Sequence, residues 1–137
     1  MISINDKVEE KKEPTATELL QEMIPTVQEI RTMALFGDVD EEKSMDLIVG
    51  MLTLTEFSPK EAPYDPITFY ISTYGGSADE MFSVYDMMTM TKKSCEIHTI
   101  GLGKVMSAGT LLLAAGTKGK RKIGRHCRVM IHAVAAG

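Results

Sequence analysis

Three places in the second half of the chain carry residues suited to covalent chemistry. Ser107 stands where a turn is expected to become a helix, and His132 stands at the end of a short apolar run. A serine hydroxyl is a poor nucleophile near neutral pH until a base accepts its proton, and histidine is the usual base. The Gly75-Gly76 pair can bring backbone N–H groups close to a substrate, because glycine has no Cβ. These residue types predict acyl transfer, with backbone amides binding the oxyanion.

Each of these signals also has a simpler interpretation. A serine at a helix start usually only caps the helix, by accepting a hydrogen bond from a free backbone N–H. A histidine at a strand end is commonly a structural or surface residue, and a diglycine pair is commonly only a turn. The residue types alone therefore lead no further than an α/β domain with a candidate site.

The elements that position these residues follow from the hydrophobic pattern. Short runs of β-branched and apolar residues predict strands at 67–72, 96–100 and 128–132. Helices are predicted between them at 77–88 and 108–115, the first opened by a Ser-x-x-Glu capping box, with a turn at 101–103 and a basic connection at 118–124. Strands that alternate with helices in this way predict right-handed βαβ units and a largely parallel sheet.

The predicted sheet brings the candidate residues to one edge. In parallel α/β sheets, ligands bind beyond the carboxyl ends of the strands, and the diglycine turn, the serine turn and His132 all follow strands. Ser107 would then lie beside the free N–H groups of a helix start, where the helix dipole favours negative charge. The N–H of Ala108 is expected to bind an oxyanion, together with an N–H from the diglycine pair.

The first half of the chain carries fewer chemical signals. Residues 1–14 are mostly charged or polar and predict a flexible N-terminal arm. The sequence Thr-Ala-Thr-Glu at 15–18 fits a capping box that opens a helix. Residues 33–36 predict a buried strand, and Asp38 or Asp40 is expected to cap the helix that follows.

Composition and charge restrict the class of protein. The chain has 137 residues, 44% of them hydrophobic and 25% charged, which is typical of one globular domain. Its start lacks an apolar leader and no apolar run is long enough to cross a bilayer, so we expect a cytoplasmic protein without membrane contact. Residues 1–66 carry 15 acidic and 6 basic side chains, whereas 67–137 carry 4 and 9. This asymmetry indicates a nucleic-acid surface or two faces that meet in an oligomer.

The residues around the candidate site resemble those of the ClpP peptidases. The segment 69–77 is similar to their substrate-binding strand and oxyanion loop, and 103–109 is similar to their nucleophile turn. The segments 115–121 and 128–132 resemble the stretch that ends in their catalytic histidine. Order and spacing agree from Ile30 to the end, and the joint match is far more specific than any single piece. The chain is identified as a member of this family.

This resemblance implies an α/β fold of the ClpP/crotonase type, made of stacked βαβ units, over residues 15–137. It implies a serine endopeptidase subunit that hydrolyses unfolded proteins, forms a homo-oligomer of two stacked heptameric rings, and receives its substrates from an AAA+ unfoldase. It implies no cofactor and no metal. Ser107 would be the nucleophile and His132 the general base, while Gly76 and Ala108 would supply the oxyanion N–H groups.

The resemblance also implies how substrate is held. Thr73, Tyr74 and Gly75 would bind the substrate peptide as an added strand. Two residues depart from the family pattern, since Tyr74 replaces a proline and Ala108 replaces a methionine. Alanine still supplies its backbone N–H, but it changes the wall of the pocket for the substrate side chain.

The family pattern continues past the histidine, into a handle helix and the aspartate of the catalytic triad. No aspartate follows His132 in this sequence, so we expect the domain to be incomplete at its C-terminal end. That carboxylate fixes the histidine tautomer and stabilises the imidazolium, and its loss in a serine protease lowers turnover about 10⁴-fold. We therefore expect the chain alone to be nearly inactive.

Other functions remain open at this point. A crotonase-type acyl-CoA enzyme shares the fold and also uses two backbone N–H groups, but does not need Ser107 and His132. A non-catalytic ClpP-like subunit or a capsid-maturation protease would share the site residues without necessarily sharing the unfoldase.

Two further kinds of site are not expected. Residues 118–128 include six Lys or Arg, but no aromatic residues interleave with them, so no nucleic acid is expected as a partner. The cysteines and histidines that could bind a metal are Cys95, His98, His126, Cys127 and His132. They lack the paired spacing of metal ligands, so no metal site is predicted.

Overall fold

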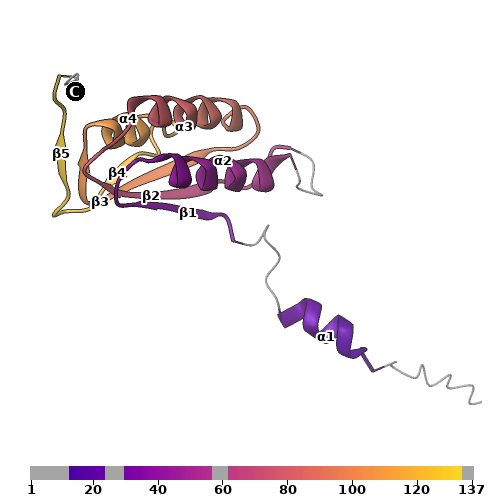
Figure 1. Cartoon of the computed structure of the whole chain (residues 1–137). Coiled ribbons are helices and arrows are strands. Elements are labelled where there is room, and N and C mark those ends of the chain that lie inside the picture. The colour runs from indigo at the N-terminus through magenta and orange to yellow at the C-terminus, as the bar shows by residue number, and fades with distance from the viewer. Residues whose placement is uncertain (1–12, 24–29, 57–61, 134–137) are drawn as a thin grey trace, which may run out of the picture.

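The structure is a computed structural model that describes residues 13–23, 30–56 and 62–133 (Figure 1). The predicted N-terminal arm therefore lies almost wholly outside the described residues. In chain order the elements are α1 (Ala16–Met23), β1 (Thr32–Phe36), α2 (Glu41–Thr55), β2 (Ile67–Thr73), α3 (Ala78–Thr91), β3 (Ile97–Met106), α4 (Ala108–Ala114), β4 (Lys122–Ile123) and β5 (Arg128–Met130). Within these ranges no helix has the length and apolar content needed to cross a bilayer.

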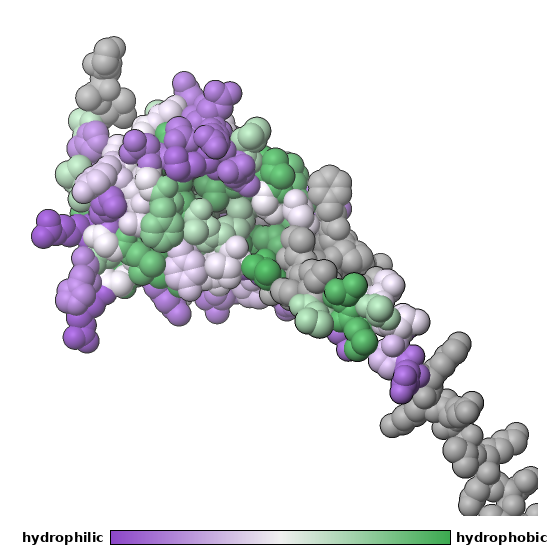
Figure 2. Space-filling view, turned by 60° about the horizontal axis from the view of Figure 1, so that its bottom comes forward, coloured by the Kyte–Doolittle hydropathy of each residue, from purple (hydrophilic) through white to green (hydrophobic). Residues whose placement is uncertain are grey.

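The strands form one parallel sheet of five strands. Its order is β1-β2-β3-β4, and β5 pairs with the distal part of β3. Helices α2, α3 and α4 cover one face of this sheet (Figure 1). Figure 2 turns the opposite face toward the viewer and shows apolar side chains over its middle, bordered by hydrophilic ones. The predicted fold class, α/β with a largely parallel sheet, is confirmed.

Strand β3 is longer than the sequence predicted, because it includes the residues 101–103 that were expected to form a turn. The ladder pairs Ile71 with Gly101 and then Thr73 with Val105, so three residues of β3 stand opposite one residue of β2. The prediction of a turn was wrong because the chain does not reverse here. The extra residues form a bulge, with one glycine at a φ of +64°, and the strand then resumes. This continuation carries β3 to the serine turn.

The last two strands also differ from their predicted bounds. The predicted basic connection contains β4, two residues that pair with the first part of β3. The predicted strand 128–132 ends at Met130, so His132 lies two residues beyond the ladder. Both short strands are exposed, which leaves little apolar signal for sequence reasoning to detect.

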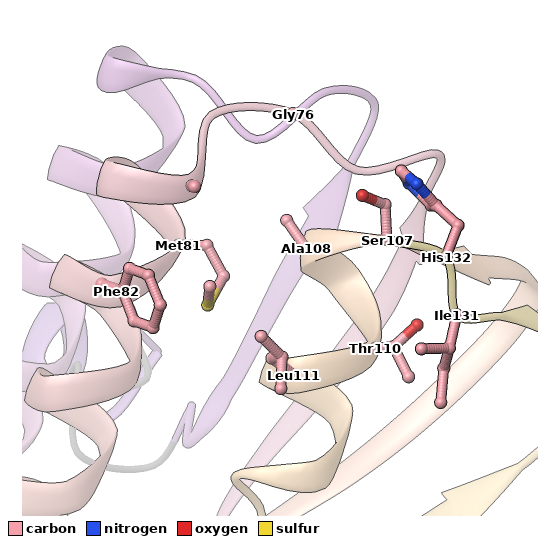
Figure 3. Close-up of a pocket in the computed structure, with 10 residues that line it drawn as sticks. Gly76, Met81, Phe82, Ser107, Ala108, Thr110, Leu111, Ile131 and His132 are labelled. Atoms are coloured by element: carbon pink, nitrogen blue, oxygen red, sulfur yellow. The ribbon is translucent and has the colours of Figure 1, made fainter. Parts of the chain in front are cut away.

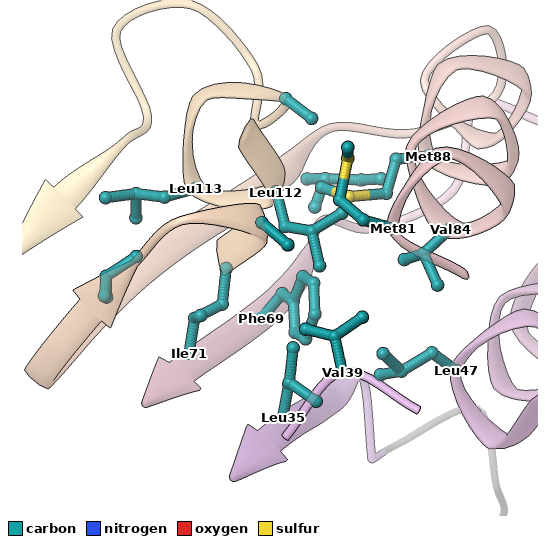
Figure 4. Packing of buried hydrophobic residues seen from close by; sticks show 14 of the residues in the cluster. Leu35, Val39, Leu47, Phe69, Ile71, Met81, Val84, Met88, Leu112 and Leu113 are labelled. Carbon is teal, nitrogen blue, oxygen red and sulfur yellow. The ribbon is translucent and has the colours of Figure 1, made fainter. Parts of the chain in front are cut away.

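The core lies between the sheet and the three helices (Figure 4). Ile67, Phe69 and Ile71 alternate along β2 and are almost wholly buried beneath the helices. Figure 4 shows Phe69 and Ile71 packed among side chains of the neighbouring elements, labelled as Leu35, Val39, Leu47, Met81, Val84, Met88, Leu112 and Leu113. Burying a side chain of this size stabilises a fold by about 1.5–3 kcal/mol. This packing fixes β2, whose carboxyl end carries the diglycine pair.

Three helices begin at the caps that the sequence predicted. Thr15 and Glu18 form a reciprocal capping box, with N–H to side-chain oxygen distances of 2.7 and 3.3 Å. Asp40 is the cap of α2 and accepts from the backbone N–H three residues later at 2.9 Å. Ser77 is the cap of α3 and accepts from the Glu80 N–H at 3.3 Å. The fourth helix, α4, begins differently, and the candidate site lies there.

Candidate active site

Ser107 links β3 directly to α4 in a strained backbone conformation. Its φ is 51° and its ψ is −124°, and it is the only non-glycine residue with a positive φ in the described part of the chain. Such a conformation costs an L-residue about 1–3 kcal/mol, and strain of this kind gathers at functional sites. A sharp strand-to-helix turn also presents a serine side chain away from the backbone, as in the nucleophile elbows of hydrolases.

The Ser107 hydroxyl does not cap the helix that it precedes. No side-chain hydrogen bond to the first turn of α4 is present, and the residue is half-buried rather than enclosed. Ser77, at the same place before α3, does cap its helix. The simpler interpretation of Ser107 as a capping residue is therefore wrong, and its hydroxyl is left free for chemistry.

The end of β5 brings His132 to the serine turn. Met106 pairs with Met130 in the ladder, and the Ser107 N–H donates to the Met130 carbonyl at 2.9 Å. Figure 3 shows the Ser107 hydroxyl and the His132 ring near one another, and both line the same pocket. No hydrogen bond between them is found in the described residues, but catalytic contacts are often long until a substrate is bound.

The His132 ring is held in one tautomer by a backbone group. Its Nδ1 lies 2.6 Å from the carbonyl oxygen of Ala133. A carbonyl oxygen can only accept, so Nδ1 carries a proton, and in the neutral ring Nε2 then has the lone pair. That is the tautomer a general base needs. In the ranges that the structure covers, no carboxylate forms an ion pair with His132.

Gly75 allows the loop after β2 to touch the serine turn. A Cβ at this position would lie 2.7 Å from the Ser107 Cβ and 3.1 Å from the Met106 carbonyl oxygen, and its φ is +110°. Only glycine fits both the space and the backbone conformation. Val39 holds the loop on both sides of Gly76. The Val39 N–H donates to the Gly75 carbonyl at 2.8 Å, and the Val39 carbonyl accepts from the Ser77 N–H at 2.9 Å.

Thr73 and Tyr74 lie differently from what the substrate-binding prediction suggests. The Thr73 side chain is wholly buried, and its hydroxyl oxygen accepts from the Gly75 N–H at 2.9 Å. Thr73 thus shapes the loop from inside the protein. Tyr74 is 66% exposed, with the Lys104 ammonium 4.8 Å from the centre of its ring. Neither side chain lines the pocket, so a role in substrate binding stays a prediction.

Two backbone donors remain free beside the serine. The Gly75 N–H is used by Thr73, whereas no acceptor for the Gly76 N–H is found among the described residues. Ala108 is the first residue of α4, and the first N–H groups of a helix have no intrahelical partner. Gly76 and Ala108 both line the pocket that holds the Ser107 hydroxyl. Their role as oxyanion donors stays a prediction that this arrangement permits.

The pocket has a volume of about 390 Å³ and is largely apolar (Figure 3). Its lining consists of Gly76, Ala78, Met81, Phe82, Ser107, Ala108, Thr110, Leu111, Ile131 and His132. The sequence did not identify Phe82, Leu111 or Thr110 as residues of the site. The available signal was spacing, since Ala78 and Phe82 are four residues apart on one helix face. An apolar pocket of this size suits a large side chain or a short peptide.

The other reactive side chains give no second site. In the segments that the structure covers, no group of three or more His, Cys, Asp or Glu could hold a metal ion. Cys95 and Cys127 are both free, and desolvation raises the pKa of each thiol. A raised pKa keeps them protonated, whereas a nucleophilic or metal-binding cysteine must be a thiolate.

By its fold, the chain is a ClpP-type α/β protein. It superposes on the ClpP protease catalytic domain from Plasmodium falciparum with a TM-score of 0.68 and 28% identity, covering 90% of this chain and 64% of that one. It superposes on a ClpP1 mutant from Listeria monocytogenes with a TM-score of 0.71 and 28% identity, covering 86% of this chain and 63% of that one.

Sequence comparison identifies the protein family to which the chain belongs. Residues 15–137 match the family model of Clp protease. The ATP-dependent Clp protease proteolytic subunit 1 of Corynebacterium jeikeium is 39% identical over 107 residues, which are 78% of this chain and 54% of the relative. Subunit 2 of Nocardia farcinica is 38% identical over 78% of this chain and 50% of the relative. The chain belongs to the Clp protease family, as the resemblance predicted, and spans about half the length of these curated relatives.

Proposed function

We propose that this chain carries the nucleophile and base of a Clp-type serine endopeptidase, with Ser107 attacking the peptide carbonyl and His132 taking its proton. One observation carries the proposal. The Ser107 hydroxyl is on a strained turn, makes no cap, and shares an apolar pocket with a histidine whose Nε2 is free. A serine that served only the fold would not need the strain.

The first chemical step is formation of an acyl-enzyme. The Ser107 oxygen bonds to the carbonyl carbon while its proton passes to Nε2 of His132, and the carbonyl oxygen becomes an oxyanion. The N–H groups of Gly76 and Ala108 stabilise that oxyanion, because neither has an acceptor among the described residues and both residues line the same pocket. The C–N bond then breaks, and His132 returns the proton to the leaving amine.

The second step is hydrolysis of the acyl-enzyme. Water bonds to the acyl carbon, gives a proton to His132, and the ester bond to Ser107 breaks as the serine recovers a proton. In both steps the histidine is briefly an imidazolium. Its Nδ1–H donates to a neutral carbonyl at 2.6 Å, and a neutral acceptor stabilises an imidazolium less than a carboxylate does. Slow turnover by the chain alone is therefore part of the proposal.

The substrate and partners follow the family. The apolar lining favours an apolar substrate side chain next to the bond that is cleaved. An extended, unfolded polypeptide suits the loop after β2, where a strand can be added. The curated relatives are named ATP-dependent proteolytic subunits. We include in the proposal an AAA+ unfoldase that delivers the substrate, and assembly of this chain into a homo-oligomer.

The test is covalent labelling by a fluorophosphonate, which reacts with activated serines and does not require turnover. The wild-type chain should be labelled on Ser107, as located by peptide mass spectrometry, and Ser107→Ala should abolish labelling. Ser77→Ala is the matched control, because Ser77 also precedes a helix but uses its hydroxyl as a cap. A wild-type chain that stays unlabelled would support the non-catalytic alternative and end the proposal.

A further inference from the structure

The Met130 carbonyl joins the two halves of the candidate site. Its oxygen accepts from the Ser107 N–H at 2.9 Å and from the Thr110 hydroxyl at 3.1 Å. A carbonyl oxygen has two lone pairs, so two donors occupy it fully. One donor is Ser107 itself, the other is in the first turn of α4, and the acceptor ends the strand that leads to His132. This oxygen therefore adds a link between the serine turn and the histidine segment to the ladder that already joins β3 and β5.

Little else holds the chain beyond Met130. Ile131 is 80% exposed, and neither it nor His132 continues the ladder with β3. Within the described segments, the one side-chain hydrogen bond found for His132 goes to its own neighbour, Ala133. The Met130 carbonyl is thus the last backbone acceptor tied to the rest of the protein before the base.

The Thr110 hydroxyl bonds outside its own helix, because Thr110 is in the first turn of α4 and the residue four positions earlier belongs to β3. A threonine inside a helix commonly donates to the carbonyl four residues earlier, as Thr89 does to Tyr85 at 3.0 Å. Thr110 instead lies 3.1 Å from the carbonyl of Met130 on another element, and 3.4 Å from that of Val105. One hydroxyl has one proton, and the shorter distance favours Met130.

We infer that Thr110 is a positioning residue, whose hydroxyl tethers the end of β5 and so keeps His132 beside Ser107. The tether itself is a property of the fold. Its effect on reactivity rests on the proposed function. Because Thr110 also lines the pocket, loss of its hydroxyl and loss of its shape must be separated by experiment.

The experiment compares three variants of the 137-residue chain. Thr110→Val keeps the branched shape but removes the donor, whereas Thr110→Ser keeps the donor. Thr89→Val removes an equivalent hydroxyl-to-carbonyl hydrogen bond at a residue that does not line the pocket. Fluorophosphonate labelling of Ser107 should slow about two- to tenfold in Thr110→Val, the range that corresponds to one hydrogen bond. Thr110→Ser should label faster than Thr110→Val because it keeps the donor, and Thr89→Val should label at the wild-type rate.

Amide hydrogen exchange provides a readout that needs no reactivity. The backbone of residues 128–132 should exchange faster in Thr110→Val than in wild type, and Thr110→Ser should restore protection. If Ser107 is labelled as slowly in Thr110→Ser as in Thr110→Val, the effect comes from packing and the inference is overturned. The inference is also overturned if Thr110→Val exchanges and labels at the wild-type rates. If the wild-type chain is not labelled at all, the proposed function fails, while the exchange data still decide whether the tether exists.

Discussion

The starts of α3 and α4 place the same residue in two different roles. Ser77 precedes α3 with a φ of −59°, and its hydroxyl accepts from the Glu80 N–H. Ser107 precedes α4 with a φ of 51°, and its hydroxyl makes no cap. Both serines donate their backbone N–H to a carbonyl from another segment, Val39 in one case and Met130 in the other. The two serines differ in both backbone torsions, since ψ is 129° at Ser77 and −124° at Ser107, and this local conformation decides the role of each hydroxyl.

This difference shows what strain achieves at the second serine. In the usual conformation a serine hydroxyl folds back onto the helix start and is consumed as a cap, which stabilises the helix by about 1 kcal/mol. The positive φ turns the Ser107 hydroxyl away from the helix start, at a cost of about 1–3 kcal/mol. The start of α4 therefore loses the stability of a cap and also bears the strain of a positive φ, and as a result one hydroxyl remains available.

The largest expected effect concerns His132, the proposed general base, which shares a pocket with Ser107. His132→Asn should slow labelling of Ser107 about 10²–10⁴-fold, because a general base contributes that much to reactions of this kind. His126→Asn is the control, an exposed histidine that does not line the pocket. Labelling rates measured at one pH check the prediction. Equal rates in His132→Asn and wild type would mean that Ser107 is no more activated than Ser77.

The next effect concerns Gly75, which lies against the Ser107 turn. Gly75→Ala combines a φ of +110° with a Cβ 2.7 Å from that of Ser107, so it should cost roughly 2–5 kcal/mol and abolish labelling. Gly119→Ala is the matched control, with a φ of +83° and nothing within 4 Å of the new Cβ. Gly119→Ala should lower the free energy of unfolding by about 1–2 kcal/mol and leave the labelling of Ser107 unchanged. Denaturant unfolding measures both, and equal losses in the two variants would contradict the close approach.

A smaller effect tests the two serines against each other. Ser77→Ala should lower the free energy of unfolding by about 1 kcal/mol, because a cap is lost. Ser107→Gly should raise it by about 1 kcal/mol, because glycine relieves the positive φ. Urea unfolding of both variants checks the opposite signs. A destabilised Ser107→Gly would show that the turn carries no strain.

The smallest effect extends the comparison to the start of α2. The hydrogen bonds from the Lys43 ammonium and N–H lower the pKa of the Asp40 carboxyl below its ordinary value of 3.8. A lowered folded-state pKa gives stability that is present above the unfolded-state pKa and is lost as the pH falls through the folded-state value. Wild type should therefore lose stability below about pH 4 relative to Asp40→Asn, which still caps but does not titrate.

The prediction for Asp40 is checked by measuring the unfolding midpoints of wild type and Asp40→Asn at neutral and acidic pH. Ser77→Ala serves as a reference, since a hydroxyl cap does not titrate in this range and its effect should not change with pH. A difference between wild type and Asp40→Asn that stays constant with pH would contradict the role of the carboxylate charge.

Sequence reasoning succeeded where the signal was local. The run of β-branched and apolar residues in β2 and the capping boxes at Thr15 and Ser77 are local patterns, and they predicted the elements to within a few residues. The prediction that a serine turn and a strand end share one sheet edge also held, because it follows from parallel topology.

Sequence reasoning failed where distant segments decide the conformation. The residues 101–103 look like a turn, but pairing with β2 and β5 on either side of the bulge keeps them in a strand. The φ of Ser107 is likewise set by the Met130 carbonyl and the Gly75 loop, which no local pattern indicates. Thr110 carried no signal at all, because a threonine in a helix looks the same whether its hydroxyl serves its own helix or another strand.

The bond from the Ser107 N–H to the Met130 carbonyl has a consequence for biosynthesis. Residue 107 is synthesised before the strand that completes its turn. The contact between the Ser107 turn and Met130 can therefore form only after β5 has been made and has docked on β3. If Ser107 is the nucleophile proposed above, the newborn chain completes its reactive site only at this late point of translation.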